Sequence, residues 1–271
     1  MDFMGKTKNS VKISIVTICY NVAEDLKKTI QSVSTQTYTN IEYIIVDGNS
    51  SDNTLNVIRE HESIITKWIS EPDKGIYDAM NKGIDMSTGD WIIFMNAGDE
   101  FYHKTVIENL CNKLYDSSVG IVYGDVELDF GKSGKLIRSL QSFDEKDVTF
   151  ELCHQGMMTR TEILKKIKYD TSFRIMADLN SFKQIRNMGY KFEYIPITFA
   201  TFQLGGISSS KPFLSLKESC RLHDVNKLSI RYLKGLLRAI RSYCLQKLLS
   251  KDIYNDMWYK RINSLKCYKQ K

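Results

Sequence analysis

Polar and acidic side chains recur in this sequence wherever a predicted strand ends. Tyr20-Asn21, Asp47-Gly48, Glu71-Pro72-Asp73 and Asn96-Ala97-Gly98-Asp99 each follow a run of apolar or β-branched residues. In open α/β sheets, the carboxyl ends of the parallel strands meet at one edge, and ligands bind there. The sequence therefore predicts a binding site at this edge that is lined by carboxylates.

Glycine-rich phosphate-binding turns do not occur at the positions where they would be needed. The first strand is followed by Cys19-Tyr20-Asn21-Val22, which argues against a nicotinamide dehydrogenase or a sugar nucleotidyltransferase, and no eight-residue P-loop is present. Carboxylates repel a diphosphate unless a divalent cation lies between them. We therefore expect a nucleotide bridged by Mg²⁺ or Mn²⁺, with Asp99 as the metal ligand.

Alternating strand and helix patterns position these residues. An apolar, β-branched run such as 12–18 is typical of a strand that is covered on both faces. Strands joined to helices by short loops predict an α/β fold with a mostly parallel, doubly wound sheet. Strands are expected at 12–18, 42–46, 66–69, 91–95, 120–123 and 154–159, helices at 24–36, from 55, at 76–86, 103–115 and 178–188, a hairpin turn at 129–135 and an extended segment at 192–202.

Composition narrows the class of protein. The chain has 271 residues, of which 42% are hydrophobic and 26% charged, which is ordinary for a globular protein. Apolar runs such as 91–95 are far shorter than the ~18 residues of a membrane span, and the first ten residues do not resemble a signal peptide. The six cysteines have no C-x-x-C spacing, so we expect reduced thiols in a cytoplasmic protein.

The carboxyl-terminal segment is strongly basic. Residues 211–271 contain fifteen Lys or Arg against four Asp or Glu, a net charge of +11, whereas residues 1–210 carry −5. Apolar residues recur there at helical spacing, which predicts a basic amphipathic helical tail. Either the tail binds an anionic membrane surface, as a peripheral protein would, or its apolar stripe packs on the catalytic body or on a second subunit of a homo-oligomer. No nucleic acid partner is expected, because the aromatics in the tail follow no base-stacking module.

Seven motifs taken together resemble family 2 of the inverting nucleotide-sugar glycosyltransferases over roughly residues 11–210. This resemblance implies the GT-A fold, with a nucleotide half at about 11–125 and an acceptor half at about 126–210, followed by the tail at 211–271. The motifs are VTICYN (16–21), VDGNSSDNT (46–54), DKGIYDAMNKG (73–83), GDWIIFMNAGD (89–99), HQG (154–156), MADL (176–179) and LGGIS (204–208).

The resemblance also implies an activity. Similar enzymes build bacterial lipopolysaccharide, capsule or exopolysaccharide, so the chain is expected to be a hexosyl- or N-acetylhexosaminyltransferase. Its donor would be a nucleotide-sugar, with UDP as the first choice, and its acceptor a saccharide or a polyprenyl-diphosphate-linked sugar at the inner face of the cytoplasmic membrane. Both acidic motifs are reduced from the usual form, which leaves a non-catalytic, nucleotide-sugar-binding subunit as the alternative.

Individual roles carry over by position. Asp47 matches the aspartate that accepts a hydrogen bond from uracil, although Asp-Gly is also a common turn. Asp52 is better explained as a turn or capping residue. His154, Gln155, Gly205 and Gly206 would face the acceptor or the diphosphate. The remaining nucleotide-binding positions are Thr17, Tyr20, Asn21, Asp73, Lys74, Asn81 and Asn96.

Two aspartates would carry the chemistry. The family usually has Asp-x-Asp where this chain has Asn96-Ala97-Gly98-Asp99, so Asp99 is the carboxylate left to bind the cation. Asp178 matches the position of the general base that deprotonates the attacking hydroxyl. Its alternative interpretation is a helix cap, because aspartate is favoured at helix starts.

Overall fold

The structure is a computed structural model that describes residues 11–113, 115–141, 152–203, 210–264 and 268–270. The first third of the chain alternates strands with helices, as expected. These elements are β1 (Ile13–Cys19), α1 (Ala23–Ser34), β2 (Ile41–Asp47), α2 (Thr54–Glu60), β3 (Lys67–Ser70), α3 (Ile76–Met86) and β4 (Trp91–Phe94).

The remaining chain completes the sheet and adds a helical end. A 3₁₀ turn at Gly131–Ser133 joins β6 to β7, and another at His154–Gly156 precedes β8. The elements are β5 (Glu100–Phe101), α4 (Val106–Cys111), β6 (Val119–Asp129), β7 (Lys135–Arg138), β8 (Met157–Arg160), α5 (Thr161–Ile167), α6 (Ala177–Asn187), β9 (Lys191–Gln203), α8 (Pro212–Leu222), α9 (Ile230–Leu248), α10 (Lys251–Asn263) and β10 (Tyr268–Gln270).

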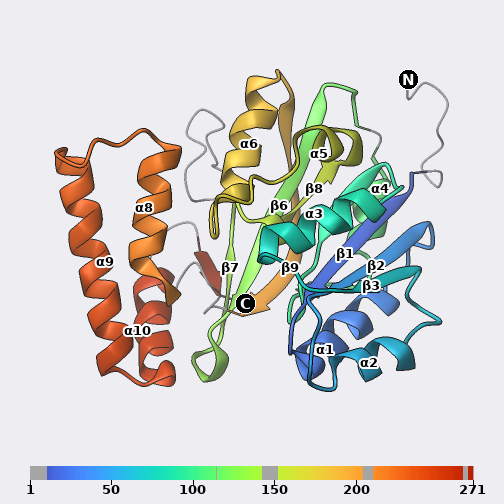
Figure 1. The fold of residues 1–271 in the computed structure, drawn as a ribbon, viewed down its shortest axis with the longest axis horizontal. Coiled ribbons are helices and arrows are strands. Elements are labelled where there is room, and N and C mark those ends of the chain that lie inside the picture. Colours follow the sequence, from blue (N-terminus) through green and yellow to red (C-terminus); the bar gives the residue numbers. More distant parts are fainter. Residues whose placement is uncertain (1–10, 114, 142–151, 204–209, 265–267, 271) are drawn as a thin grey trace.

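Strand β1 lies between β2 and β4 and is parallel to both, with β3 parallel to β2 on the outside. Its side chains alternate between two cores, because successive residues of a strand point to opposite faces. Ile13 and Ile15 pack with α1, α2 and α4, whereas Val16 and Ile18 pack with α3, α5 and α6. Helices thus cover both faces of the sheet (Figure 1), which explains why every residue of β1 is buried and all but Ser14 and Thr17 are apolar.

The second half of the sheet is mixed rather than parallel. Strand β8 is antiparallel to both β4 and β6, β7 is antiparallel to β6, and only β9 runs parallel to β6. The expected α/β class is confirmed. The mostly parallel sheet that the sequence predicted is found only in the half formed by β1 to β4. A short hairpin joins β6 to β7, and short hairpins require antiparallel neighbours.

Three element predictions missed the observed bounds by more than two residues. The strand predicted at 120–123 is longer, because β6 continues to Asp129 in its pairing with β9. Helix α4 is shorter than the predicted 103–115, because the Tyr115 hydroxyl donates to the carbonyl of Leu110 and its ring packs against Trp91, which turns the chain toward the core. The strand predicted at 154–159 begins only at Met157. The three residues before it form the 3₁₀ turn that carries His154.

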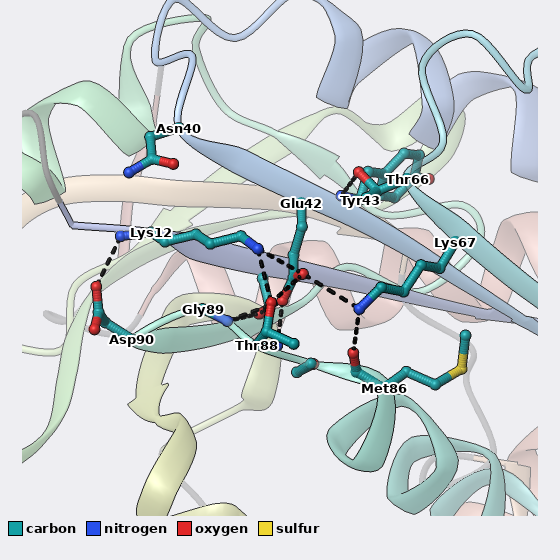
Figure 2. A network of polar contacts seen from close by, with 12 residues as sticks. Lys12, Asn40, Glu42, Tyr43, Thr66, Lys67, Met86, Thr88, Gly89 and Asp90 are labelled. Carbon is teal, nitrogen blue, oxygen red and sulfur yellow. Dashed lines mark hydrogen bonds and ion pairs between the residues drawn. The ribbon is translucent and has the colours of Figure 1, made fainter.

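A buried glutamate ties the amino-terminal ends of the strands together (Figure 2). Glu42 of β2 accepts hydrogen bonds from the Ser14 hydroxyl, the Lys12 ammonium group at 2.9 Å, and Thr88 and Gly89 in the loop before β4. Burial alone raises the pKa of this carboxyl, but these hydrogen bonds outweigh burial and lower it to about 2. Glu42 therefore stabilises the fold in its ionised form.

Replacing Glu42 with Gln should change the pH dependence of stability. The folded pKa lies below the ordinary value of 4.5, so the ionised group contributes stability above pH 4.5 that is lost as the pH falls toward 2. The shift corresponds to about 3 kcal/mol of unfolding free energy. Urea unfolding across this range should show a flatter acid limb for Glu42→Gln than for the wild type. Exposed Glu60→Gln on α2 is the control, and an unchanged acid limb in Glu42→Gln would contradict this role.

The basic segment forms three helices, and two of them pack on the body. Helix α10 places Trp258, Tyr259 and Ile262 against the core of the β6–β7 hairpin, and α8 contacts the loop before α6. Figure 1 shows α8 between the sheet and α9, which lies at the outer edge of the molecule. Among the described residues, no helix is both long and apolar enough to cross a bilayer.

Candidate active site

The predicted site edge forms as expected, because the ends of three strands are hydrogen-bonded to one another. Asp47 at the end of β2 is in register with Cys19 of β1, and the Ala97 amide after β4 donates to the carbonyl of Ile18. The polar residues that follow β1, β2 and β4 therefore lie along one edge of the sheet.

The loop after β4 is shaped by a buried threonine of α1. The Thr29 hydroxyl accepts from the Gly98 amide at 2.9 Å and lies 2.8 Å from the carbonyl oxygen of Asp99, to which it can donate. Gly98 adopts φ +98°, a conformation that favours glycine. Thr29 was not predicted as a site residue. The signal available in the sequence was a polar threonine on the apolar face of the helix that became α1. In the structure this residue has no exposed surface.

Two oxygens in this loop are buried and unpaired. Asn96 Oδ1 and Asp99 Oδ2 have no hydrogen-bond partner within the described parts of the chain. Burial raises the pKa of Asp99 from its usual value to about 7, although nearby His154 and a hydrogen bond from Gln155 act in the opposite direction. Unpaired buried polar atoms are costly. Both atoms are hard oxygen donors of the kind that Mg²⁺ and Mn²⁺ prefer, so the loop fits such a cation.

The protein supplies few ligands for that cation. No group of three His, Cys, Asp or Glu in the described ranges is arranged to hold a metal ion. A cation held by Asn96 and Asp99 would need further oxygen ligands from another molecule. This is consistent with the reduced motif noted in the sequence.

His154 joins this loop to Asp178. Its Nε2 lies 2.9 Å from Asn96 Nδ2, and its Nδ1 lies 3.4 Å from Asp178 Oδ2. Because an amide nitrogen can only donate, Nε2 is the acceptor, and a neutral ring then carries its proton on Nδ1, facing Asp178. The same orientation of Asn96 leaves its Oδ1 for the cation. The structure therefore brings Asn96, Asp99, His154 and Asp178 together.

Asp178 is held by its own helix and by α3. Its Oδ1 accepts from the Leu179 amide at 2.9 Å and lies 3.0 Å from the Tyr77 hydroxyl, which also reaches the carbonyl of Ile175. Burial, and then the neighbouring Asp178, raise the pKa of Tyr77 well above its usual value. Tyr77 therefore keeps its single hydroxyl proton, for which the Ile175 carbonyl and the Asp178 carboxylate are both acceptors. Its role was not predicted.

A residue of the basic segment supports Asp178 from behind. Glu218 of α8 is buried and accepts from the backbone amides of Arg174, Ile175 and Met176 at 2.7, 2.9 and 3.0 Å. These amides lie in the loop that leads directly into α6 and Asp178. Helix α8 is therefore part of the site, which the division at residue 210 did not anticipate.

The part of this sheet edge that lies next to Gly48 is exposed to solvent. Tyr20 is 61% exposed, and it lies close to Gly48 and Asp73. A Cβ atom at Gly48 would lie only 2.6 Å from Asp73 Oδ2 and 3.3 Å from Tyr20 Cδ2. Any side chain at position 48 would therefore displace these neighbours. The three residues form a small polar and aromatic cluster beside the Asn96–Asp99 loop.

Several predicted nucleotide-binding side chains make internal hydrogen bonds instead. Asp47 has no exposed surface, and it accepts from the Ser50 amide, the Ser50 hydroxyl and, at 2.6 Å, the Ser70 hydroxyl. The Thr17 hydroxyl, also fully buried, donates to the carbonyl of Met95 at 2.6 Å. In this state neither side chain is accessible to a ligand.

Asn21 and Asn81 hold loops in place. Asn21 Oδ1 accepts from the Ser51 amide at 2.8 Å, and Asn81 makes two hydrogen bonds to the backbone of Tyr169, at 2.9 and 2.8 Å. Asp52 lies in the turn before α2, and its carboxylate accepts from the amides of Ala23 and Thr54.

The other predicted residues fall at the margins of the site. Lys74 is exposed, and its backbone carbonyl accepts from the guanidinium group of Arg174. Gln155 follows His154 and is hydrogen-bonded to Asp99. Gly205 and Gly206 lie outside the described residues.

Comparison with known proteins identifies the family. The model of the family described as Glycosyl transferase family 2 matches residues 14–193, which contain both the Asn96–Asp99 loop and Asp178. The chain belongs to this family. It is a glycosyltransferase, as the resemblance of its motifs predicted.

Relatives in this family align along most of the chain. One is the PGL/p-HBAD biosynthesis glycosyltransferase of Mycobacterium bovis, which is 28% identical over 240 residues, covering 83% of this chain and 89% of the relative. Another is the amylovoran biosynthesis glycosyltransferase AmsB of Erwinia amylovora, which is 24% identical and covers 94% of this chain and 97% of the relative. Because these relatives are named glycosyltransferases, the alternative of a non-catalytic subunit is not favoured.

Solved structures confirm the GT-A fold. The mannosyltransferase PcManGT of Pyrobaculum calidifontis, solved in complex with GDP-Man and Mn²⁺, superposes with a TM-score of 0.63 at 15% identity, covering 94% of this chain and 81% of that one. S. aureus TarS 1–349 in complex with UDP gives a TM-score of 0.59 at 12% identity, with coverages of 94% and 72%. At these identities the likeness concerns the fold.

Mn²⁺ binding should depend on pH through Asp99. With a pKa of about 7, this carboxyl is mostly protonated at pH 6 and mostly ionised at pH 8. Because a cation competes with the proton, Mn²⁺ affinity should rise about tenfold over this range. Free Mn²⁺ can be measured by electron paramagnetic resonance. Asp99→Asn should bind weakly at both pH values and Glu60→Gln like the wild type. Affinity that is independent of pH in the wild type would contradict the assignment.

Removing Glu218 should disturb the site as well as the fold. Glu218→Ala leaves three backbone amides without their acceptor, of which the buried Met176 amide costs about 1–3 kcal/mol. We expect a lower melting temperature and, well below that temperature, a kcat reduced by at least about tenfold. Lys217→Ala, at the neighbouring exposed position of α8, is the matched control. Normal kcat in a destabilised Glu218→Ala protein would show that Glu218 supports only the fold.

Proposed function

We propose that the chain transfers a sugar, with inversion, from a nucleoside diphosphate sugar to a hydroxyl group of a growing cell-surface polysaccharide or lipid-linked oligosaccharide. One observation supports this proposal above all. His154 contacts Asn96 on one side and Asp178 on the other, and Asn96 lies in the same loop as the unpaired oxygen of Asp99. A group that can hold a diphosphate through a cation and a group that can take a proton are thereby placed next to each other.

The nucleoside would bind over Tyr20, Gly48 and Asp73. Tyr20 offers an exposed aromatic ring on which a base can stack, and Asp73 offers a carboxylate that can accept from the base or the ribose. UDP is the proposed nucleotide, in keeping with the uracil role that the resemblance assigns to Asp47. The Asp47 carboxylate already accepts hydrogen bonds from Ser50 and Ser70. We therefore propose that it contributes to binding of the uracil ring indirectly, because it holds the loop after β2 in place.

Asn96 and Asp99 would hold Mn²⁺ or Mg²⁺ together with the donor diphosphate. When bound, the cation supplies positive charge that stabilises the nucleoside diphosphate as a leaving group. His154 positions Asn96, and Gln155 positions Asp99. The affinity of the site for the cation would then depend on the donor, because the chain itself contributes few ligands.

Asp178 would act as the general base. The acceptor oxygen forms the new bond to the anomeric carbon as the bond from that carbon to the diphosphate oxygen breaks, and the acceptor proton passes to Asp178. Oδ1 is occupied by the Leu179 amide and the Tyr77 hydroxyl. Oδ2, with the longer 3.4 Å contact to His154, retains a lone pair for the proton.

The general-base role is tested by Asp178→Asn. Asparagine keeps the size of the side chain but cannot accept the proton, so turnover should fall by about 10²–10⁴-fold. Affinity for UDP, measured by calorimetry, should change by less than about threefold, because the nucleoside cluster is untouched.

A matched variant distinguishes catalysis from helix capping. Glu162→Gln also removes a carboxylate from the first turn of a helix, α5, where the side chain is exposed. It should lower stability by at most about 1 kcal/mol and leave turnover unchanged. If Asp178→Asn showed the same small effect with normal turnover, Asp178 would be a cap and another base would be required.

A further inference from the structure

Helix α9 exposes a continuous row of large apolar side chains. Ile230, Leu233, Leu237, Ile240 and Leu248 are all exposed, and Leu237 and Leu248 are 59% and 80% accessible. They occur at intervals of three, four, three and eight residues, with Cys244 between the last two, so they lie along one side of the helix. Apolar side chains that are this exposed and this regularly spaced indicate a surface that another body covers.

The opposite side of α9 packs against α8. Ala239 is buried, and a Cβ atom at Gly235 would lie 2.6 Å from Leu216 Cδ1, so glycine permits the close approach of the two helices. Phe213 of α8 packs against Tyr243 in a tilted arrangement, with ring centroids 5.6 Å apart. The packing of α9 on the body is therefore already satisfied by this side, and the exposed row is left over.

A row of basic side chains runs beside the apolar row. Arg231, Lys234, Arg238 and Arg241 are exposed at the same three- and four-residue spacing, and the 19-residue helix contains no Asp or Glu. Within the described ranges, none of these four side chains forms an ion pair. The acidic Asp252 and Asp256 of α10 pair with Lys132 and Lys260 instead.

We propose that α9 lies flat on an anionic lipid bilayer, with its apolar row at the acyl boundary and its basic row at the headgroups. Further exposed apolar residues flank the helix in the sequence. Leu228, which is 95% exposed, precedes α9 beside Lys227, and the exposed Ile253 follows on α10. The helix alone offers about 28 Å of contact length. This inference does not depend on the identity of the donor or of the base.

Charge favours a bilayer over a second copy of the chain. If two α9 helices packed antiparallel through their apolar rows, Lys234 and Arg241 would lie at the edge of the contact. Each would then be close to the basic residues at the same edge of the other copy. Like charges in that position oppose association, whereas anionic headgroups attract each basic residue. Figure 1 shows α9 at the outer edge of the molecule, and the exposed side chains of the apolar row give the side that can meet a flat surface.

The test measures flotation of the full-length chain with phosphatidylcholine vesicles, with and without phosphatidylglycerol. The wild type should bind only the anionic vesicles and should dissociate at high salt. Lys234→Gln/Arg238→Gln/Arg241→Gln should weaken partitioning by about 100-fold, since each charge contributes about 1 kcal/mol. Leu237→Gln should weaken it by about tenfold. All replaced side chains are exposed, so the melting temperature should remain that of the wild type.

Matched controls lie on the body. Lys104→Gln/Lys165→Gln/Lys166→Gln removes three exposed charges, and Met188→Gln removes an exposed apolar side chain, both away from α9. These variants should bind vesicles like the wild type. Absence of wild-type binding to anionic vesicles, or equal weakening by the controls, would overturn the proposal. So would a wild-type dimer that Leu237→Gln dissociates without any vesicle binding. Turnover on a water-soluble acceptor should be unaffected, which separates this outcome from a failure of the proposed function.

Discussion

The contact of one imidazole ring with two loops underlies the arrangement of the site. His154 reaches Asn96, which follows a parallel strand of the first half, and Asp178, which begins a helix of the second half. Because the Asn96 amide nitrogen can only donate, it also determines which ring nitrogen carries the proton and which Asn96 oxygen remains free. A single hydrogen-bonding pattern therefore orients the proposed metal ligand Asn96 and the proposed base Asp178 together. Reorienting the ring would disturb both.

The carboxyl-terminal helices serve two purposes in this fold. Glu218 of α8 binds three consecutive amides just before α6, so α8 supports the position of Asp178. Helix α10 covers the β6–β7 hairpin through Trp258 and Tyr259. Helix α9 keeps a row of apolar side chains outward, and its other side approaches α8 closely at Gly235. The basic segment is thus anchored to the catalytic body while it presents a different surface to the outside.

Much of the fold and part of the site could be predicted from the sequence. The apolar pattern of β1 indicated a strand that is covered on both faces, and the polar residues after β1, β2 and β4 indicated one edge, because these signals are local. Strand β8 inserts between β4 and β6 in the antiparallel direction, and Glu218 accepts hydrogen bonds from the backbone before α6. Both features depend on contacts between segments that are distant in the sequence, so no local pattern predicts them. Asp47 illustrates the limit at a single residue: the Asp-Gly pair indicated the end of a strand, but the hydroxyl of Ser70 that occupies the carboxylate comes from the next strand.

The burial of Asp99 has a thermodynamic consequence for loading of the enzyme. Near neutrality, a fraction of the molecules holds a proton on this carboxyl, since its pKa is about 7. A cation that takes its place must expel that proton into the solvent, so loading is an exchange of one positive species for another. The buffer then absorbs the released proton. The heat of loading will consequently differ between buffers of unequal ionisation enthalpy, and the slope of that difference counts the protons released.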